Sequence, residues 1–401
     1  MQSRFTSRLL IAGLAFSFAL GACSDPAPTK DGAPDPKGQD PATEQPGTPD
    51  TAAVNVMEAY DRGLDFLASQ QEGGIWKTQG YPDPGSSALA LSVFLERPGG
   101  AREQDKEIIS KGLAFISSSL GDDGGVRQAP SPNYMTSAAI SALAASGDPA
   151  YKGKIERAAK YIEKLQFLED GPSQGGIGYG SDKTRSDMSN TQFALGSLRA
   201  AGISADDPVF QKALQFVSRS QNRKENEAAG APTEWKDEKG NVVVHGNDGG
   251  ANYRPFDSKA GTDKLPDGKL VTRSYGSMTY ALLRCYHLCG LEATDGRVQA
   301  AVDWISGNWD LEANAGMAGE HSTDGLYYYY MTMAKALDVA GIDTIEREGA
   351  ATVNWRAELS QKLAQLQKQD GSWVNPNERW NEGYPVIVTS YSLLALSKCD
   401  G

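Results

Sequence analysis

The chain has 401 residues with 51 acidic and 39 basic side chains, which give a formal net charge of −12. No dense run of Lys and Arg occurs downstream of the N-terminus. Because binding a phosphate backbone requires a clustered basic surface, the composition argues against nucleic acid as the partner. Hydrophobic residues at 39% are ordinary for a globular protein, whereas 44 glycines and 20 prolines indicate many turns between short elements.

Residues 1–23 have the pattern of an export signal. Arg4 and Arg8 form a basic start, a short apolar run follows, and small residues precede Cys23. The ending Leu-Gly-Ala-Cys resembles the lipobox of bacterial lipoproteins, which implies that Cys23 becomes an acylated N-terminus, and Ser24 favours the outer membrane. We therefore expect a cell-envelope protein that is lipid-anchored and faces the periplasm or the cell surface. An ordinary signal peptide with an incidental cysteine is the alternative.

Residues 24–53 form the next segment, in which Pro, Asp, Gly and Thr dominate and large apolar side chains are almost lacking. No core can form from that composition. The segment predicts an extended tether between the membrane and a folded body that begins at residue 54.

From residue 54 onward one pattern is repeated about six times, and each copy starts with an amphipathic helix. Near its end a small residue precedes an aromatic and an aliphatic residue at matched offsets, which is a packing face of helical period. The matching stretches are Gly63-Leu-Asp-Phe-Leu67, Gly112-Leu-Ala-Phe-Ile116, Ala159-Lys-Tyr-Ile162, Ala213-Leu-Gln-Phe-Val217 and Ala301-Val-Asp-Trp-Ile305.

A glycine-containing turn follows most of these helices, and a second helix starts after it. Glycine lets the chain leave a helix through a left-handed conformation that other residues resist. The second helices are apolar nearly all round, so each must be buried on all sides. Hydroxyl and amide side chains at their starts are expected to cap the first turn. These starts are Ser86, Thr136, Asn190, Ser277 and Thr389.

Helical hairpins of this kind predict an inner ring of apolar helices surrounded by an outer ring of amphipathic ones. The first and last copies share a fuller turn, Gln70-Gln-Glu-Gly-Gly-Ile-Trp76 and Gln367-Lys-Gln-Asp-Gly-Ser-Trp373. We expect its amide to bond backbone and its indole to pack between helices, joining neighbouring hairpins. Because both ends of the repeat array carry this form, a closed ring is favoured over an open solenoid.

These two stretches resemble the QW motif of squalene and oxidosqualene cyclases, and residues 54–401 resemble the prenyltransferase and squalene-oxidase repeat superfamily. The resemblance implies an all-α fold, the (α/α)6 toroid of the terpene cyclases. Residues 222–273 interrupt the fourth hairpin as a long polar insertion with Val242-Val-Val244 as its one strand-like run. We expect this insertion to cap one mouth of the ring.

The motifs that carry the best-known reactions of this superfamily do not occur in the chain. The sequence has no Asp-x-Asp-Asp of class II cyclases, no Asp-x-Cys of protein prenyltransferases and no Cys-Gly-Glu-Gln of thioester domains. On a helix, His287 points to a different side from Cys285 and Cys289, so the three cannot converge on one metal ion. We therefore expect no metal and no cofactor. Cys285 and Cys289 are expected to be buried free thiols, with a disulfide as the alternative.

A candidate site lies in the turn that enters the fifth inner helix. Glu320, His321 and Asp324 are placed there at the expected mouth of the ring. An acid beside a histidine can act as an acid/base pair. A solvated histidine in a structural turn is the alternative.

A run of four tyrosines begins three residues after Asp324. Four consecutive positions cover every side of a helix, so one or two of these rings should point into the ring interior. Tyr327, Tyr328 and Tyr329 are therefore candidates for binding an apolar ligand or a cation. Core packing is the alternative.

A second candidate lies within the long insertion, where Asp248, Tyr253 and Arg254 are close in sequence. An acid, an aromatic and a guanidinium in one loop can hold a polar ligand. A turn with a structural salt bridge is the alternative.

Since the signature motifs do not occur, we expect a non-catalytic envelope protein whose toroid binds an apolar, isoprenoid-type ligand, another lipid or a protein partner. The alternative is a divergent enzyme that acts on an isoprenoid or a glycan through acids at the mouth. A lipid binder predicts aromatic side chains from the inner-helix starts around one space. A glycan enzyme predicts an open cleft with two carboxylates about 5–10 Å apart.

Overall fold

The computed structural model describes residues 55–127, 129–180, 185–226 and 232–400. The predicted export signal, its lipidation site Cys23 and the predicted tether lie outside the described residues. The chain divides into two units, Met1–Thr51 and Ala52–Gly401, and the fold is that of the second unit.

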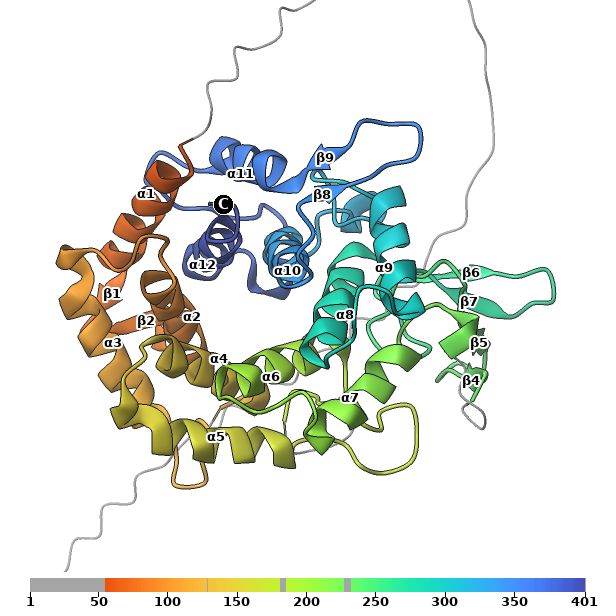
Figure 1. Ribbon diagram of the computed structural model, residues 1–401, viewed down its shortest axis with the longest axis horizontal. Helices are drawn as coiled ribbons and strands as arrows, with labels where there is room; N and C mark the ends of the chain where they lie inside the picture. Colours follow the sequence, from red (N-terminus) through yellow and green to blue (C-terminus); the bar gives the residue numbers. More distant parts are fainter. Residues whose placement is uncertain (1–54, 128, 181–184, 227–231, 401) are drawn as a thin grey trace, which may run out of the picture. The chain divides into compact units, whose positions relative to one another are not determined.

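The described part of this unit contains twelve α-helices that alternate between an outer and an inner ring (Figure 1). The outer helices are α1 (Val56–Ser69), α3 (Lys106–Ser119), α5 (Lys152–Lys164), α7 (Pro208–Arg219), α9 (Gly296–Gly307) and α11 (Trp355–Leu366). The inner helices are α2 (Pro84–Leu95), α4 (Pro132–Ala145), α6 (Met188–Ala200), α8 (Gly276–Leu288), α10 (Leu326–Val339) and α12 (Pro385–Leu396). The predicted (α/α)6 toroid is confirmed.

The ring is closed. Each inner helix contacts the next along the chain, and α12 returns to contact α2. In the outer ring α1 contacts α11, so the first and last hairpins are neighbours, as Figure 1 shows. The arrangement is a toroid and not an open solenoid.

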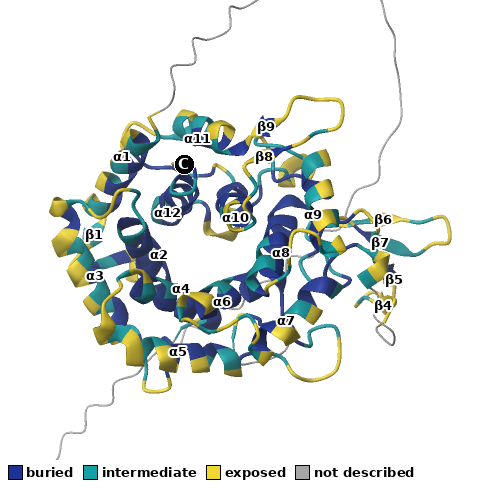
Figure 2. Cartoon of the chain, in the orientation of Figure 1, coloured by how far each residue is buried: buried dark blue, intermediate teal, exposed yellow. Residues whose placement is uncertain are grey.

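The two rings differ in burial (Figure 2). In α2 every residue from Gly85 to Phe94 is buried, whereas α7 buries one side that carries Phe210, Ala213 and Val217. A helix that is apolar all round is stable only when other elements surround it. The helix α2 has α4 and α12 at its flanks and α3 on its outer side.

A glutamine after each of three outer helices joins that helix to the next hairpin. The Nε2 of Gln166 donates to the carbonyl of Val209 in α7 at 2.8 Å. Gln221 and Gln367 repeat the pattern, each donating to a glycine of its own turn and to the next outer helix. For Gln367 the next helix is α1, whose Ala59 carbonyl accepts at 2.8 Å. The same bond therefore closes the ring.

The two tryptophans of the fuller turn are fully buried. The indole N–H of Trp76 donates to the carbonyl of Leu67 in α1, and that of Trp373 donates to the carbonyl of Leu363 in α11, both at 2.8 Å. Each indole thus ties the turn to the end of the outer helix that precedes it.

Turn glycines bring the backbones of neighbouring hairpins into contact. Five of them have positive φ, and a Cβ on each would lie 2.1–2.4 Å from a backbone atom of the next outer helix. They are Gly74, Gly124, Gly175, Gly249 and Gly371. No other residue fits these positions without moving the next outer helix.

The hydroxyl side chains expected to cap the inner helices have a different role. In five hairpins a Ser or Thr inside the inner helix accepts a backbone N–H from the preceding turn at 3.0–3.1 Å. The donor and acceptor pairs are Trp76 with Ser87, Val126 with Thr136, Ile177 with Thr191, Ala251 with Thr279, and Trp373 with Thr389. The capping prediction is wrong because the helices begin earlier, behind acids such as Asp83 in α2 and Asp187 in α6.

The insertion before α8 forms a four-stranded sheet of order β4-β5-β7-β6, in which β5 and β7 are parallel and the other pairs antiparallel. Its strands are β4 (Glu234–Lys236), β5 (Val242–Val244), β6 (Thr262–Lys264) and β7 (Leu270–Thr272). The sheet projects beside α7 and α9, outside the ring (Figure 1). The expected cap over a mouth is therefore not formed by this sheet.

The remaining strands are β1 (Gln71–Glu72), β2 (Ile75–Thr78), β3 (Tyr81–Pro82), β8 (Thr344–Ile345) and β9 (Val353–Asn354). Short 3₁₀ helices are η1 (Glu103–Asp105), η2 (Pro149–Tyr151), η3 (Lys224–Asn226), η4 (Gly319–His321) and η5 (Arg379–Asn381). Of the helices in the described residues, none combines the length and the apolar character needed to cross a membrane.

Gly371→Ala tests the seam between the last and first hairpins. The new Cβ would lie 2.3 Å from the Arg62 carbonyl in α1. We expect the free energy of unfolding to fall by about 3 kcal/mol or more. Gly349→Ala is the matched control, because Gly349 has a φ of +68° and no atom within 4 Å of its Cβ position. The control should lose about 1 kcal/mol from backbone strain alone. Equal losses in urea unfolding would show that the contact with α1 contributes nothing.

Candidate functional site

Acidic side chains at the starts of three inner helices are used as helix caps. Asp83 accepts a backbone N–H from the first turn of α2 at 2.8 Å, and Asp187 accepts one from α6 at 2.9 Å. Glu382, from the loop before α12, accepts two from the first turn of α10, at 2.7 and 3.2 Å. Because a carboxylate stabilises the positive end of a helix, these acids have a structural function.

Four aromatic side chains meet at the centre of the ring and are called the axial cluster: Tyr134 of α4, Phe193 of α6, Tyr328 of α10 and Tyr391 of α12. The ring centroids of Tyr134 and Phe193 lie 5.0 Å apart, and those of Tyr328 and Tyr391 lie 6.1 Å apart. Since α4 and α6 face α10 and α12 across the ring, contacts between the two pairs cross its centre.

The axial cluster is joined across the ring in two ways. The hydroxyls of Tyr134 and Tyr391 lie 3.3 Å apart, and the ring centroids of Phe193 and Tyr328 lie 6.2 Å apart. Burial raises the pKa of Tyr134 to about 12, so its hydroxyl stays neutral at physiological pH. Tyr134, Phe193 and Tyr328 nevertheless keep accessible surface. The cluster thus offers apolar surface inside the ring without exposing a charge.

Of the three tyrosines predicted to bind a ligand, only Tyr328 reaches the centre. Its hydroxyl accepts a hydrogen bond from the Gln192 amide of α6. Tyr327 is 3% exposed and packs against Tyr330, with 5.7 Å between ring centroids. Tyr329 is fully buried, and its hydroxyl donates to the Asp310 carbonyl at 2.7 Å. Tyr327 and Tyr329 therefore belong to the wall of the toroid.

The predicted residues Glu320, His321 and Asp324 lie together before α10. Asp324 is 2% exposed on its side chain, and the Nδ1 of His321 lies 3.1 Å from its Oδ2. Arg379 donates to the same oxygen, and Asn377 donates to the other at 2.6 Å. Glu320 is 89% exposed and lies 3.7 Å from the Nε2 of His321. Because both oxygens of Asp324 already have donors, the groups open to a ligand are His321 and Glu320.

The loop before α12 completes this cluster and carries backbone strain. Trp380 and Asn381 have positive φ values of 58° and 69°, which are uncommon for residues other than glycine. The Trp380 ring is half-exposed, packs on Gly325, and has the Arg379 guanidinium 4.9 Å from its centre. Sequence reasoning missed Arg379 and Trp380, although they occupy the turn that corresponds in the sixth hairpin to residues 316–325 in the fifth.

Glu382 is a carboxyl that sequence reasoning also missed. It is fully buried and accepts from the Asn375 amide at 2.8 Å in addition to the N–H groups of α10. Burial raises the pKa of Glu382 from its ordinary 4.5 to about 7. Because Glu382 is isolated from solvent, it cannot touch a substrate. Its role is to hold the first turn of α10 through the hydrogen bonds that it accepts.

The second predicted group, Asp248, Tyr253 and Arg254, does not act as one cluster. Asp248 accepts from the hydroxyl of Ser274 at 2.7 Å. Arg254 donates to Asp257 at 2.9 Å. The hydroxyl of Tyr253 lies 3.2 Å from that of Tyr179. The three side chains thus take different partners.

Cys285, Cys289 and Cys399 are buried free thiols, as expected for the first two. Burial raises the pKa values of Cys289 and Cys399 to about 12, which disfavours the thiolate that metal binding needs. Within the residues that the structure describes, no group of three or more His, Cys, Asp or Glu could hold a metal ion.

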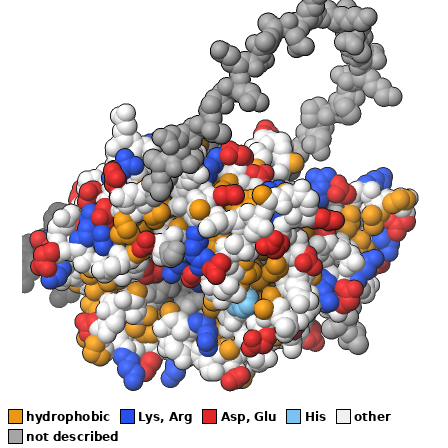
Figure 3. All heavy atoms as spheres, turned by 45° about the horizontal axis from the view of Figure 1, so that its top comes forward, with side chains coloured by type: hydrophobic (Ala, Val, Ile, Leu, Met, Phe, Trp, Pro, Cys, Tyr) orange, Lys and Arg blue, Asp and Glu red, His pale blue; other side chains and the backbone are white. Residues whose placement is uncertain are grey.

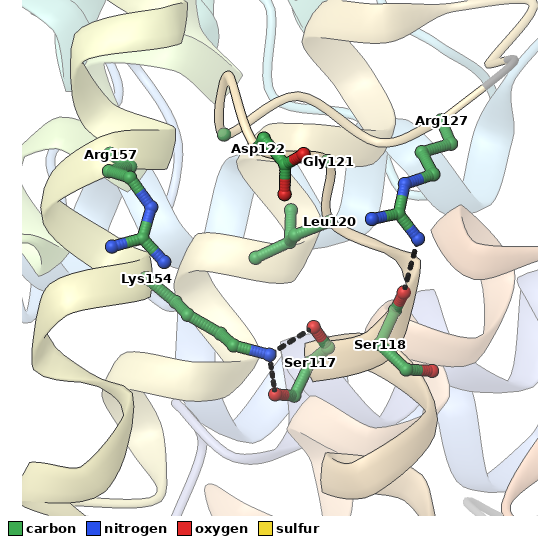
Figure 4. A pocket seen from close by; sticks show the side chains of 9 residues that line it. Ser117, Ser118, Leu120, Gly121, Asp122, Arg127, Lys154 and Arg157 are labelled. Carbon is green, nitrogen blue, oxygen red and sulfur yellow. Dashed lines mark hydrogen bonds between the residues drawn. The ribbon is translucent and has the colours of Figure 1, made fainter.

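A pocket of 230 Å³ lies between α3 and α5, outside the inner ring (Figure 4). The Nζ of Lys154 donates to the carbonyl and hydroxyl of Ser117, at 2.7 and 2.6 Å, and Arg127 donates to the Ser118 carbonyl at 3.4 Å. These carbonyls end α3, and cations stabilise the C-terminal end of a helix. Lys154 and Arg127, two of the cations that line this pocket, therefore stabilise the end of α3.

A second pocket, of 330 Å³, is lined by residues of α8, α9 and the segment that follows α10, and includes His287 and Val298. Neither pocket contains a residue of the axial cluster. On the face shown in Figure 3, acidic and basic side chains are interspersed with hydrophobic ones.

Comparisons with known proteins bear on the fold. No family model and no curated protein matches the chain. Among solved structures, the type II terpene cyclase MstE from Scytonema is 12% identical with a TM-score of 0.51, and the match covers 86% of this chain and 96% of the cyclase. A protein from Actinoplanes is 16% identical, with a TM-score of 0.49 and coverage of 86% and 100%. Unsaturated glucuronyl hydrolase from Streptococcus agalactiae is 13% identical, with a TM-score of 0.46 and coverage of 86% and 92%.

These identities are low, so the likeness concerns the fold alone. The protein has the helical toroid that type II terpene cyclases also have.

Glu382→Gln tests the buried carboxyl through the pH dependence of stability. Below about pH 4.5 the carboxyl is protonated in both the folded and the unfolded protein. As the pH rises from 4.5 to about 7, the unfolded chain releases the proton while the folded protein retains it, so stability from this group is lost across that window. In urea unfolding at pH 5 to 8 the variant should lose less stability with rising pH than the wild type. Glu320→Gln, at an exposed position, is the control and should keep the wild-type slope. A slope unchanged in Glu382→Gln would contradict the assignment.

Proposed function

We propose that this protein is a lipid-anchored, non-catalytic protein of the bacterial cell envelope whose toroid binds an apolar, isoprenoid-type ligand. The observation that carries the proposal is the axial cluster, in which aromatic rings from four inner helices meet inside the ring and keep accessible surface. Aromatic faces bind apolar chains by contact area and can stack on their double bonds.

The acids at the mouth support a binding role over a catalytic one. Asp83, Asp187 and Glu382 cap inner helices, and each oxygen of Asp324 accepts a hydrogen bond, from Asn377 or Arg379. A glycan enzyme would need two carboxylates open to one substrate. The alternative, an enzyme that acts on an isoprenoid or a glycan through acids at the mouth, therefore has less support.

One structural neighbour agrees with the ligand class. The cyclase MstE has been solved in complex with geranylgeranyl dihydroxybenzoate as substrate, with a TM-score of 0.51 to this chain. A toroid of this shape can thus hold a chain of isoprene units.

The ligand is tested with a photoreactive geranylgeraniol analogue and the full-length protein in nanodiscs. Crosslinks should fall on α4, α6, α10 or α12. Phe193→Ala and Tyr328→Ala each remove aromatic contact surface, so labelling should fall by about tenfold. Trp235→Ala is the matched control, because it removes an exposed aromatic from β4 outside the ring. Labelling that is equal in all variants, or confined to the outer helices, would refute the proposal.

The anchor is tested separately. Cys23→Ser removes the sulfur that would carry the lipid, so the variant should leave the membrane fraction and lose its acyl mass. Cys399→Ser, at a buried cysteine near the other end of the chain, is the control and should stay with the membrane. Membrane association that persists in Cys23→Ser would contradict lipid anchoring.

A further inference from the structure

Charged side chains form a second level inside the ring, two turns beyond the axial cluster. Lys335 follows Tyr328 on α10 by seven residues, and Lys398 lies in the turn after α12, two residues beyond its last helical residue. Seven residues are almost two helical turns, so Lys335 lies on the same face of α10 as Tyr328 and about 10 Å further along. Arg284 of α8 lies at a similar depth, because it is the ninth residue of α8 and Lys335 is the tenth of the neighbouring α10.

These three cations face one acid. Glu96, at the end of α2, attracts both Lys335 and Arg284 electrostatically, whereas Arg284 and Lys398 repel Lys335. In the part of the chain that the structure describes, Arg284, Lys335, Lys398 and Glu96 form no ion pair within 4 Å. The inner surface therefore carries an excess of positive charge.

Arg284 and Lys335 lie deep in the ring and still keep accessible surface. Burial lowers the pKa of Lys335 to about 8, which reflects a cation without sufficient counter-charge. The Nη1 of Arg284 donates to the side-chain oxygen of Gln192 at 3.2 Å, and Gln192 in turn donates to Tyr328. One hydrogen-bonded chain thus links Arg284 to the axial cluster.

Two small residues lie near these cations. Ser141 of α4 follows Tyr134 by seven residues and so lies two turns beyond it, whereas Gly196 of α6 follows Phe193 by three and lies about one turn beyond it; both keep accessible surface. A Cβ on Gly196 would lie 2.6 Å from the Arg284 guanidinium, so the guanidinium occupies the place of that missing side chain. Gly196 therefore leaves room for the guanidinium of Arg284 from the neighbouring helix α8.

The cations of the outer pocket differ in one respect. Lys154 and Arg127 donate to backbone carbonyls that end α3 (Figure 4). Among the described residues, no acceptor lies within hydrogen-bonding distance of Lys335 or Lys398. A cation that burial partly desolvates, as it does Lys335, is costly without a partner, and an anion would offset that cost.

We propose that Arg284 and Lys335 bind the anionic group of the toroid's ligand, a carboxylate or a phosphate, while its apolar chain lies against the axial cluster. This inference rests on the proposed function, which supplies the apolar chain of the ligand. Arg284 and Lys335 indicate in addition that the ligand is acidic. Lys398 supports the same group through its charge.

The experiment compares geranylgeraniol, geranylgeranoic acid, geranylgeranyl monophosphate and inorganic phosphate on the full-length protein in amphipol. In the wild type each acidic isoprenoid should bind at least about tenfold more tightly than the alcohol, as expected for a charge-assisted contact. Lys335→Met and Arg284→Met should remove this preference, so that the acids and the alcohol bind with similar affinity. Lys154→Met, from the outer pocket, is the matched control and should keep the preference. Arg284→Lys, which retains the charge, should keep part of it.

The outcomes separate the two proposals. Equal binding of alcohol and acids in the wild type would overturn the anion site and leave the isoprenoid proposal standing. Binding of inorganic phosphate that Lys335→Met abolishes, with no isoprenoid bound, would support the anion site and overturn the isoprenoid proposal. A preference for acids that survives in both Met variants would assign it to another surface and overturn the inference.

Discussion

An inner helix that is apolar on every side has to be enclosed on every side, and the rest of the structure depends on that constraint. The helix α2, buried from Gly85 to Phe94, cannot be satisfied by one neighbour. A closed ring gives each inner helix two inner neighbours, and the outer ring covers its back. An open array would leave the first and last inner helices with an exposed apolar side.

Close approach of neighbouring hairpins is what makes this enclosure tight. Glycines such as Gly175 and Gly371 allow the turn to touch the backbone of the next outer helix, and a glutamine amide bonds across the same contact. Buried amides of this kind are favourable only when both N–H groups find acceptors, and in Gln166, Gln221 and Gln367 they do. The seam therefore specifies spacing as well as adding stability.

The same geometry explains why most polar groups at the mouth have a structural role. Side chains that could bind a ligand lie in the interior of the ring instead. Carboxyls at the inner-helix starts meet unpaired N–H groups and are used as caps. Deeper in the ring, the inner helices turn their side chains toward one another across a narrow space. That space cannot hold a large apolar side chain from every helix. Aromatic rings fill one level, and Arg284 and Lys335 with their incomplete counter-charge occupy the next.

The amino-acid sequence by itself determined the repeat, the alternation of amphipathic and apolar helices and hence the toroid, because those features are local and periodic. It also located the turn that contains His321 and Asp324. It could not reveal Arg379 and Glu382, which join that turn from the next hairpin, nor the sheet around β5, whose other strands are only three residues long and show no pattern. Nor could it select Tyr328 from four adjacent tyrosines, because helix rotation is set by packing. Only the tertiary structure decided which side chains face the centre of the ring, since a cluster from four different helices has no signature in any one segment.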